Sequence, residues 1–236
     1  MPKPNETWTV APHGKLTELS SNLFTVTGQL EMPVGETTRR MTIARMSTGG
    51  LVVFSAISLD DFEMTKIDAL GSVDYLIVPS SIHRMDIKGW KTRYPHALVV
   101  APEGAKKEVE ELVPVDLTHV ELFDPKVCVD VVPGTGEQEF SMLVETDTGK
   151  TLVVNDLIFN LPKVPGIAGI GLKLLGFAPG QAKQPKIVRM KLVDDDDAMR
   201  AQLRAWAEMA GLERILVSHG TPIENPRETL LALAAA

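Results

Sequence analysis

Two short stretches of the chain each place a side chain able to bind a metal ion directly after an apolar run. Thr151–Asp156 reads Thr-Leu-Val-Val-Asn-Asp, and Arg214–Gly220 reads Arg-Ile-Leu-Val-Ser-His-Gly. Both apolar runs are typical of buried strands. In open α/β sheets, chemistry collects at the carboxyl ends of strands, because rigid backbone there meets loops that are free to carry polar groups. We therefore expect Asp156 and His219 to lie at a functional site.

A third stretch, Asp74–Asp86, is built in the same way. Its apolar run Tyr-Leu-Ile-Val is followed by a loop that carries His83 and Asp86. A buried imidazole is usually satisfied by a carboxylate or by a backbone group. These histidines and aspartates can therefore serve as metal ligands, or they can simply bind one another in a site without metal.

Composition limits the class of protein. The chain has 236 residues, 44% of them hydrophobic, which is enough to bury the core of one large α/β domain or of two fused half-domains. Its formal net charge is −7, and its Lys and Arg residues form no cluster, so we do not expect nucleic acid as a partner. A small-molecule substrate or ligand is the partner that we expect.

The sequence also predicts where the protein works. Cys128 is the only cysteine, which excludes an intrachain disulfide and favours the cytoplasm. Because Cys128 lies within an apolar strand-like run, we predict that it is a small core residue. The start of the chain lacks the apolar segment of a secretion signal, and no run reaches the ~18 to 20 apolar residues of a membrane span. We therefore expect no membrane association.

The pattern of elements predicts two β-rich halves, about 15–115 and 116–236, within a single domain over residues 1–236. The first half begins with antiparallel strands and continues with alternating strands and helices, and the second half repeats this order loosely. The strands predicted in the second half lie at 118–123, 127–132, 141–145, 151–154 and 214–217, with helices at 197–210 and after Pro226. Two sheets packed face to face, with helices on both outer faces, would accommodate this order.

The glycine- and proline-rich stretch 160–186 separates the last two strands, and its apolar centre is Ile167–Phe177. Loops of this length inside compact domains are usually functional or mobile. The apolar centre is either a short helix folded back over the core, or a flap over a site or contact for a homodimer.

The whole pattern resembles the metallo-β-lactamase superfamily, from about Leu16 to the last helix. The resemblance rests on the order of the three strand ends, on Arg40-Met-Thr-Ile43, on the Pro-x-x-x-His loop of Pro79–His83, and on the run Trp90–Pro95. It implies a mixed α/β (α+β) fold, a four-layer αββα sandwich with its site along one edge between the sheets. It also implies that Asp156 is the bridging aspartate of that superfamily, and that His219 is its final histidine.

The resemblance is to a branch with an incomplete set of metal ligands. The superfamily's His-x-His-x-Asp-His loop is represented by Ser80–Asp86, which contains one histidine. The superfamily's middle histidine usually follows a Pro-Gly turn, where this chain has Thr135 or Gly136. A site with two ions therefore requires more ligands than this pattern offers.

Four side chains remain as ligands for a single ion of zinc, iron or manganese, and they are His83, Asp86, Asp156 and His219. A catalytic zinc site needs about three protein ligands and one open position. With such an ion activating a water molecule, His83 and Asp86 are the predicted catalytic residues, with Asp86 as the general base.

Two functions follow from these patterns. The first is a metal-dependent hydrolase with at most one ion, and the resemblance implies an ester, amide, thioester or phosphoester substrate. The second is a catalytically silent binding or scaffold protein that keeps the fold without metal. In the second case the apolar segment Ile167–Phe177 offers the contact surface.

Overall fold

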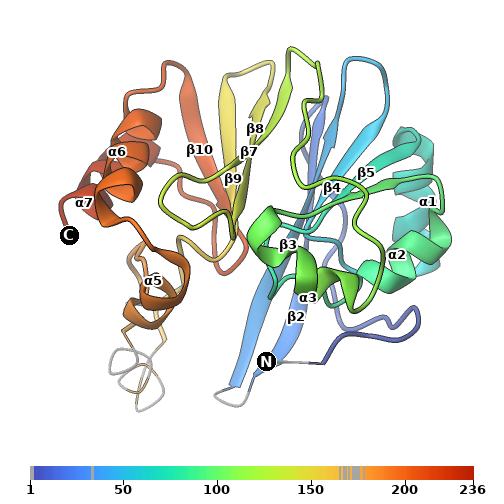
Figure 1. Cartoon of the computed structure of the whole chain (residues 1–236), viewed down its shortest axis with the longest axis horizontal. Coiled ribbons are helices and arrows are strands. Elements are labelled where there is room, and N and C mark those ends of the chain that lie inside the picture. The colour runs from blue at the N-terminus through green and yellow to red at the C-terminus, as the bar shows by residue number, and fades with distance from the viewer. Residues whose placement is uncertain are drawn as a thin grey trace.

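The computed structural model describes residues 3–236 except 33–34, 165, 167–168, 170, 172–175 and 178, and it describes no side chains for 31–36. Most of the segment Ile167–Phe177 therefore lies outside the described residues. The described chain forms two sheets that face each other, with helices on the two outer sides (Figure 1).

The first sheet has six strands in the order β1-β2-β3-β4-β5-β6. Strands β1 to β4 pair with one another in antiparallel fashion, and β5 and β6 continue the sheet from β4 in parallel. The hairpin of β2 and β3 stays in register from Leu23 opposite Ala44 to Met32 opposite Gly35, so it extends well beyond the other strands. The strands are β1 (Thr17–Ser20), β2 (Leu23–Met32), β3 (Gly35–Arg45), β4 (Leu51–Phe54), β5 (Val73–Ile77) and β6 (Leu98–Val100).

The second sheet has four strands in the order β10-β9-β8-β7. Strands β7, β8 and β9 form an antiparallel meander, and β10 pairs with β9 in parallel. These strands are β7 (Val127–Val131), β8 (Phe140–Glu145), β9 (Lys150–Val154) and β10 (Leu212–Val217). All of them come from the second predicted half of the chain.

The helices cover the outer faces of both sheets. Those on the first sheet are α1 (Asp61–Leu70), α2 (Ile87–Arg93) and α3 (Lys106–Glu110), the last preceded by a 3₁₀ turn at Glu103–Ala105. Those on the second sheet are α6 (Asp196–Ala207) and α7 (Pro226–Ala234), and α5 (Lys186–Leu192) lies near them. Helix α6 begins where the Asp195 side chain accepts the backbone N–H groups of Asp197 and Ala198, which satisfies amides that the first turn leaves free.

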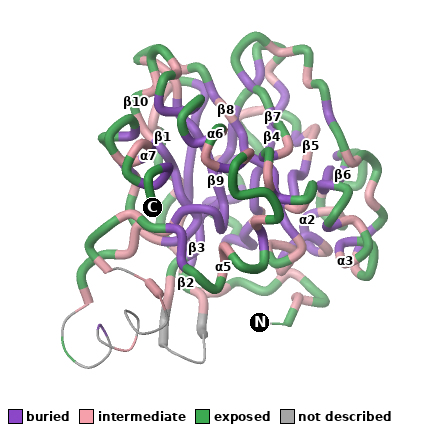
Figure 2. The backbone as a smooth tube through the Cα atoms, turned by 60° about the vertical axis from the view of Figure 1, so that its left-hand side comes forward, coloured by how far each residue is buried: buried purple, intermediate pink, exposed green. Residues whose placement is uncertain are grey.

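Three layers of core lie between these four layers of structure. Alternate side chains of β4 point in opposite directions: Val53 packs toward the helices with Trp90, while Phe54 packs toward the second sheet with Phe140. Met199 of α6 lies in the third layer, between the second sheet and its helices. The buried backbone therefore runs through the middle of the molecule (Figure 2), and the predicted four-layer αββα sandwich is confirmed.

Three details differ from the sequence predictions. The predicted strand at 118–123 is wrong, because this stretch is irregular chain in which Val120 is buried while Phe123 is 91% exposed. Cys128 is exposed, so its prediction as a core residue is also wrong. Helix α5 had no predicted counterpart. Among the described residues, no helix combines the length and the apolar character that crossing a membrane requires.

Candidate metal centre

Two of the predicted site residues face each other because of the register of β9 and β10. Val154 is paired with Val217 in the parallel ladder, so the next residues on the two strands also lie side by side. Ser218 Oγ donates to Asn155 Oδ1, and one residue further on Asp156 meets His219. The sheet therefore brings together residues that are 63 positions apart in sequence.

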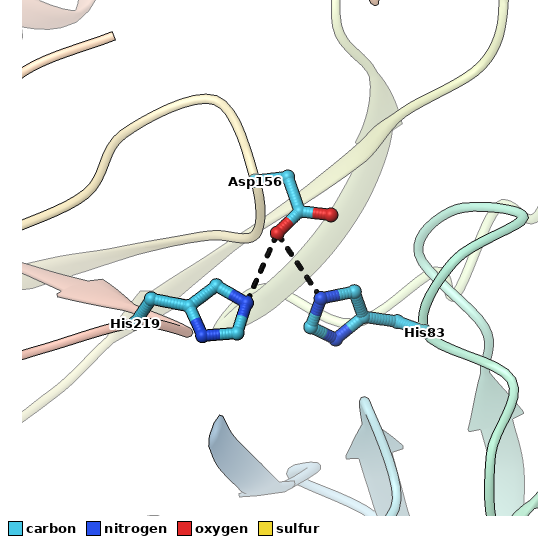
Figure 3. Close-up of side chains that lie close together, drawn as sticks. All are labelled: His83, Asp156 and His219. Atoms are coloured by element: carbon cyan, nitrogen blue, oxygen red, sulfur yellow. Dashed lines mark hydrogen bonds and ion pairs between the residues drawn. The ribbon is translucent and has the colours of Figure 1, made fainter. Parts of the chain in front are cut away.

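His83 reaches the same place from the other sheet. It lies in the loop between β5 and α2, where its backbone N–H donates to the Ser80 carbonyl at 3.2 Å. Its Nε2 lies 3.1 Å from Asp156 Oδ1, and His219 Nε2 lies 3.2 Å from the same oxygen (Figure 3). The three ligand atoms all lie within 4.8 Å of one another, which makes a cluster of two imidazoles and one carboxylate.

Both imidazole rings are also contacted at Nδ1, the nitrogen that does not face Asp156. His83 Nδ1 lies 2.9 Å from Ser55 Oγ, and His219 Nδ1 donates to the Thr38 carbonyl at 2.7 Å. The ring of Phe159 stacks on His219 with centroids 4.8 Å apart. Because each Nδ1 is engaged, each Nε2 is directed at Asp156, which is the arrangement that outer partners give to metal-binding histidines.

The three side chains are only 5–9% exposed. Burial alone would raise the pKa of Asp156, but the charges and hydrogen bonds of His83 and His219 outweigh burial and hold this pKa well below its ordinary value. Burial would also lower the pKa of His219, yet the Asp156 carboxylate and the Thr38 carbonyl raise it above the ordinary value. Without metal, the Asp156 carboxylate and the His219 imidazole therefore each favour the charged form of the other.

A second carboxyl group lies behind Asp156. Glu139 is fully buried, and its Oε1 accepts the Asp156 backbone N–H at 3.0 Å. Burial, and then the negative charge of Asp156, raise the pKa of Glu139 well above its ordinary value. The remaining oxygens, Glu139 Oε2 and Asp156 Oδ2, are buried without a hydrogen-bond partner in the described residues. Glu139 is therefore suited to support Asp156 as an uncharged group.

Asp86 is not part of this cluster. Its carboxylate pairs with Arg39 at 2.5 Å and accepts a hydrogen bond from Asn5 Nδ2 at 2.9 Å. Of the four predicted ligands, the structure thus brings together His83, Asp156 and His219, and places Asp86 in a separate ion pair.

Sequence reasoning missed the residues that support the cluster. Thr38 contributes a backbone carbonyl, which any residue type could supply, so no sequence signal could have found it. Ser55 directly follows the apolar strand β4, which is the same signal that identified Asp156, but this signal did not say which of the many polar strand ends would meet. Glu139 comes before β8, at the start of a strand, so that signal does not point to it.

The four-layer sandwich of this chain is the fold of the metallo-β-lactamases. The metallo-β-lactamase FIM-1 from Pseudomonas aeruginosa, in its mono-zinc form, matches with a TM-score of 0.64 and 13% identity over 98% of both chains. The metallo-β-lactamase from Pontibacter korlensis matches with a TM-score of 0.64 and 13% identity over 94% of this chain and 98% of that chain. The metallo-β-lactamase from Hirschia baltica has a TM-score of 0.62 and 11% identity over the same shares. No protein-family model and no curated protein matches the sequence.

The donor set fits one ion of the zinc type. Zinc–ligand bonds of about 2.0–2.2 Å at tetrahedral angles separate neighbouring ligand atoms by about 3.3–3.6 Å. The two distances from Asp156 Oδ1 to the histidine nitrogens are 3.1 and 3.2 Å, slightly shorter than that separation. Three ligands leave a fourth position open, as in catalytic zinc sites. A second ion would need further ligands, and the cluster found among the described residues contains only these three.

Proposed function

We propose that this protein is a metal-dependent hydrolase that uses a single ion held by His83, Asp156 and His219. The convergence of these three ligand atoms within 4.8 Å is the observation that carries the proposal. The metallo-β-lactamase fold supports it, since one of the matching structures holds that enzyme in a mono-zinc form. Zinc is the first candidate for the ion, and iron and manganese also suit imidazole and carboxylate ligands.

When bound, such an ion would activate water and polarise the substrate bond. The residues of the chain would orient the ligands and exclude water. Ser55 and Thr38 would keep the His83 and His219 rings in the orientation that binding needs, and Glu139 would hold the Asp156 backbone. Their burial would exclude bulk water from the ligands. The substrate classes that we propose are esters, amides, thioesters and phosphoesters.

Metal analysis tests this function directly. Protein purified without chelator should contain about one equivalent of metal, and His219→Ala should lose most of it, because the ligands dominate affinity. His119→Ala is the matched control, since His119 is an exposed histidine whose charged neighbour, Glu121, lies 3.9 Å away. Less than about a tenth of an equivalent in the wild type, with no change in His219→Ala, would count against the proposal.

Hydrolysis would then be measured on chromogenic substrates. A phenyl ester, a thioester, a phosphodiester and a β-lactam represent the proposed classes. Activity that disappears with chelator and returns with zinc would support the enzyme. Equal rates in the wild type and in His219→Ala would contradict it.

A second candidate is a binding or scaffold protein that keeps the fold without metal. It is favoured by the hydrogen bonds among the three side chains, because Asp156 already satisfies both imidazoles. Such a protein would bind a small molecule or a second copy of itself. Full stability of metal-free protein, together with no zinc uptake at micromolar concentrations, would favour this candidate.

A further inference from the structure

Arg40 is a buried arginine of β3 whose guanidinium group holds the chain on both sides of His219. The residue is only 7% exposed. Its Nε donates to the Val217 carbonyl at 3.0 Å, and its Nη2 donates to the Gly220 carbonyl at 3.0 Å. One planar group thus connects the first sheet to the last residue of β10 and to the residue that follows His219.

The hydrogen-bond partners of Arg40 are uncharged. Its third contact is from Nη1 to Thr25 Oγ1 at 3.2 Å, and among the described residues no carboxylate lies within ion-pair distance of it. Desolvation lowers the pKa of Arg40. A buried charge without a counter-ion is costly, and hydrogen bonds to it are what offset that cost. The two carbonyl groups that Arg40 binds, those of Val217 and Gly220, lie on either side of His219. We therefore connect the buried charge of Arg40 with the position of His219.

Contacts other than those of Arg40 also restrain the segment around His219. The His219 carbonyl accepts the Asn160 backbone N–H at 3.1 Å. Gly220 has a φ of 111°, and a Cβ at this position would lie 2.0 Å from the Asn160 carbonyl oxygen. Asn160 therefore restrains this turn from one side, and Arg40 restrains it from the side of the first sheet.

The same strand also fixes the ring. Thr38, two residues before Arg40 on β3, provides the carbonyl that accepts the His219 Nδ1 proton. A single rigid element thus holds the backbone of His219 through Arg40 and its imidazole through Thr38.

We propose that Arg40 is a positioning residue, which fixes the His219 backbone so that the imidazole can donate to Thr38 and direct Nε2 at Asp156. Its effect on a bound ion depends on the proposed function, but its effect on the His219 ring does not. Arginine suits this role because its donors point in several fixed directions, whereas lysine presents one compact charge on a flexible stem.

Two variants of Arg40 distinguish the effect of its planar guanidinium group from the effect of its charge. Arg40→Lys keeps the positive charge without the planar group, and Arg40→Met removes both. The control is Arg45→Lys, because Arg45 is an exposed arginine at the end of the same strand. The first readout is the NMR signal of the His219 Nδ1 proton in metal-free protein, assigned by its loss in His219→Ala. The second is the zinc dissociation constant from a titration, and thermal unfolding reports whether each variant is folded.

We expect folded Arg40→Lys to lose the slowly exchanging Nδ1 signal and to bind zinc about 10- to 100-fold more weakly, as substitutions of outer partners do. Arg45→Lys should match the wild type. An Arg40→Lys or Arg40→Met variant that keeps both the signal and the affinity would overturn the proposal. A lower unfolding temperature with an unchanged signal would also overturn it, because Arg40 would then stabilise the fold without orienting the ring.

Two further outcomes keep the proposals distinguishable. If the wild type binds no zinc, the hydrolase proposal fails, and the Nδ1 signal alone decides the role of Arg40. If neither Arg40 variant folds, hydrogen exchange in the wild type decides instead. The Arg40 Nε proton should then exchange at least about tenfold more slowly than that of Arg45. Equal exchange rates would overturn the role of Arg40.

Discussion

Asp86 and Arg39 form a buried ion pair in which a carboxylate oxygen lies 2.5 Å from a guanidinium nitrogen. The two side chains are 0% and 8% exposed, respectively. Asp86 Oδ2 has no well-aligned hydrogen-bond donor, so the contact is a charge pair more than a directed hydrogen bond. The pair joins the loop that carries His83 to β3, next to the carbonyl of Thr38 that holds His219.

Replacing Asp86 with Ala should therefore destabilise the protein. The substitution leaves the Arg39 charge buried without its partner, and losses of about 3–5 kcal/mol in the free energy of unfolding are typical of such changes. The matched control is Glu208→Ala in the exposed pair with Arg227, where we expect a loss below about 1 kcal/mol. Urea denaturation measures both. An Asp86→Ala variant that keeps wild-type stability but loses hydrolysis would instead support Asp86 as the general base.

Substitutions of Ser55 can distinguish its two effects, the strain in its own backbone and the orientation of His83 by its hydroxyl group. Its φ of 57° is in the left-handed region, where non-glycine residues are strained by about 1–3 kcal/mol. Its hydroxyl group contacts His83 Nδ1. Ser55→Ala and Ser55→Gly both remove that contact, so each should weaken zinc binding about tenfold or more. Only Ser55→Gly should also relieve the strain.

Thermal unfolding and zinc titration of the two Ser55 variants provide the measurement. We expect Ser55→Gly to unfold at a higher temperature than Ser55→Ala while binding zinc equally weakly. Wild-type zinc affinity in either variant would show that the hydroxyl does not orient His83.

The sequence was sufficient to predict that Asp156 and His219 lie at one site, because their positions at strand ends follow from local patterns. Each stands directly beyond an apolar run, and two such runs that pair in parallel must bring their ends together. The four layers were predictable for a similar reason, since the order of strands and helices restricts how apolar faces can be covered. Neither prediction required knowledge of side-chain contacts.

Asp86 shows why the ligand set was not fully predictable. Its residue type and its spacing from His83 suit a ligand, yet the partner that it meets is Arg39, which comes from a strand almost fifty positions earlier. Sequence patterns do not show whether a carboxylate such as Asp86 will lie beside a metal site or beside an arginine such as Arg39. The prediction for 118–123 fails for a related reason. Its alternating pattern is that of a strand, but among the described residues no strand pairs with it, and only Val120 is buried.

Glu139 gives a prediction about the support of Asp156. Glutamine at this position keeps an oxygen that can accept the Asp156 N–H, whereas leucine of similar size cannot. We expect Glu139→Leu to lose about 1–3 kcal/mol, because a buried N–H is left without an acceptor. Glu139→Gln should lose less. Chemical denaturation compares the two, and the prediction is contradicted if both variants lose equal stability.

Cys128 gives a prediction about pH. Cys128 is exposed as a residue, but partial desolvation of its sulfur, together with the hydrogen bond from Sγ to Asp130 Oδ2 at 2.9 Å, raises the pKa of the Cys128 thiol to about 12. The pKa of an unperturbed thiol is about 8.5. Because the folded pKa is the higher one, the protonated thiol contributes stability that is present below the unfolded pKa and is lost as the pH rises toward 12. Native Cys128 should therefore resist alkylation at pH 8, despite its exposure.

The labelling rate with iodoacetamide, followed by mass spectrometry between pH 7 and pH 10, tests this expectation about Cys128. We expect native protein to react about a thousandfold more slowly at pH 8 than the urea-unfolded chain, because the thiolate is the reactive form. Asp130→Asn should accelerate labelling, but only in part, since partial desolvation of the sulfur is the larger cause of the raised pKa. Glu145→Gln, an exposed carboxylate at the end of β8, is the control and should leave the rate unchanged. Native labelling as fast as that of the unfolded chain would mean that neither partial desolvation nor Asp130 protects the thiol.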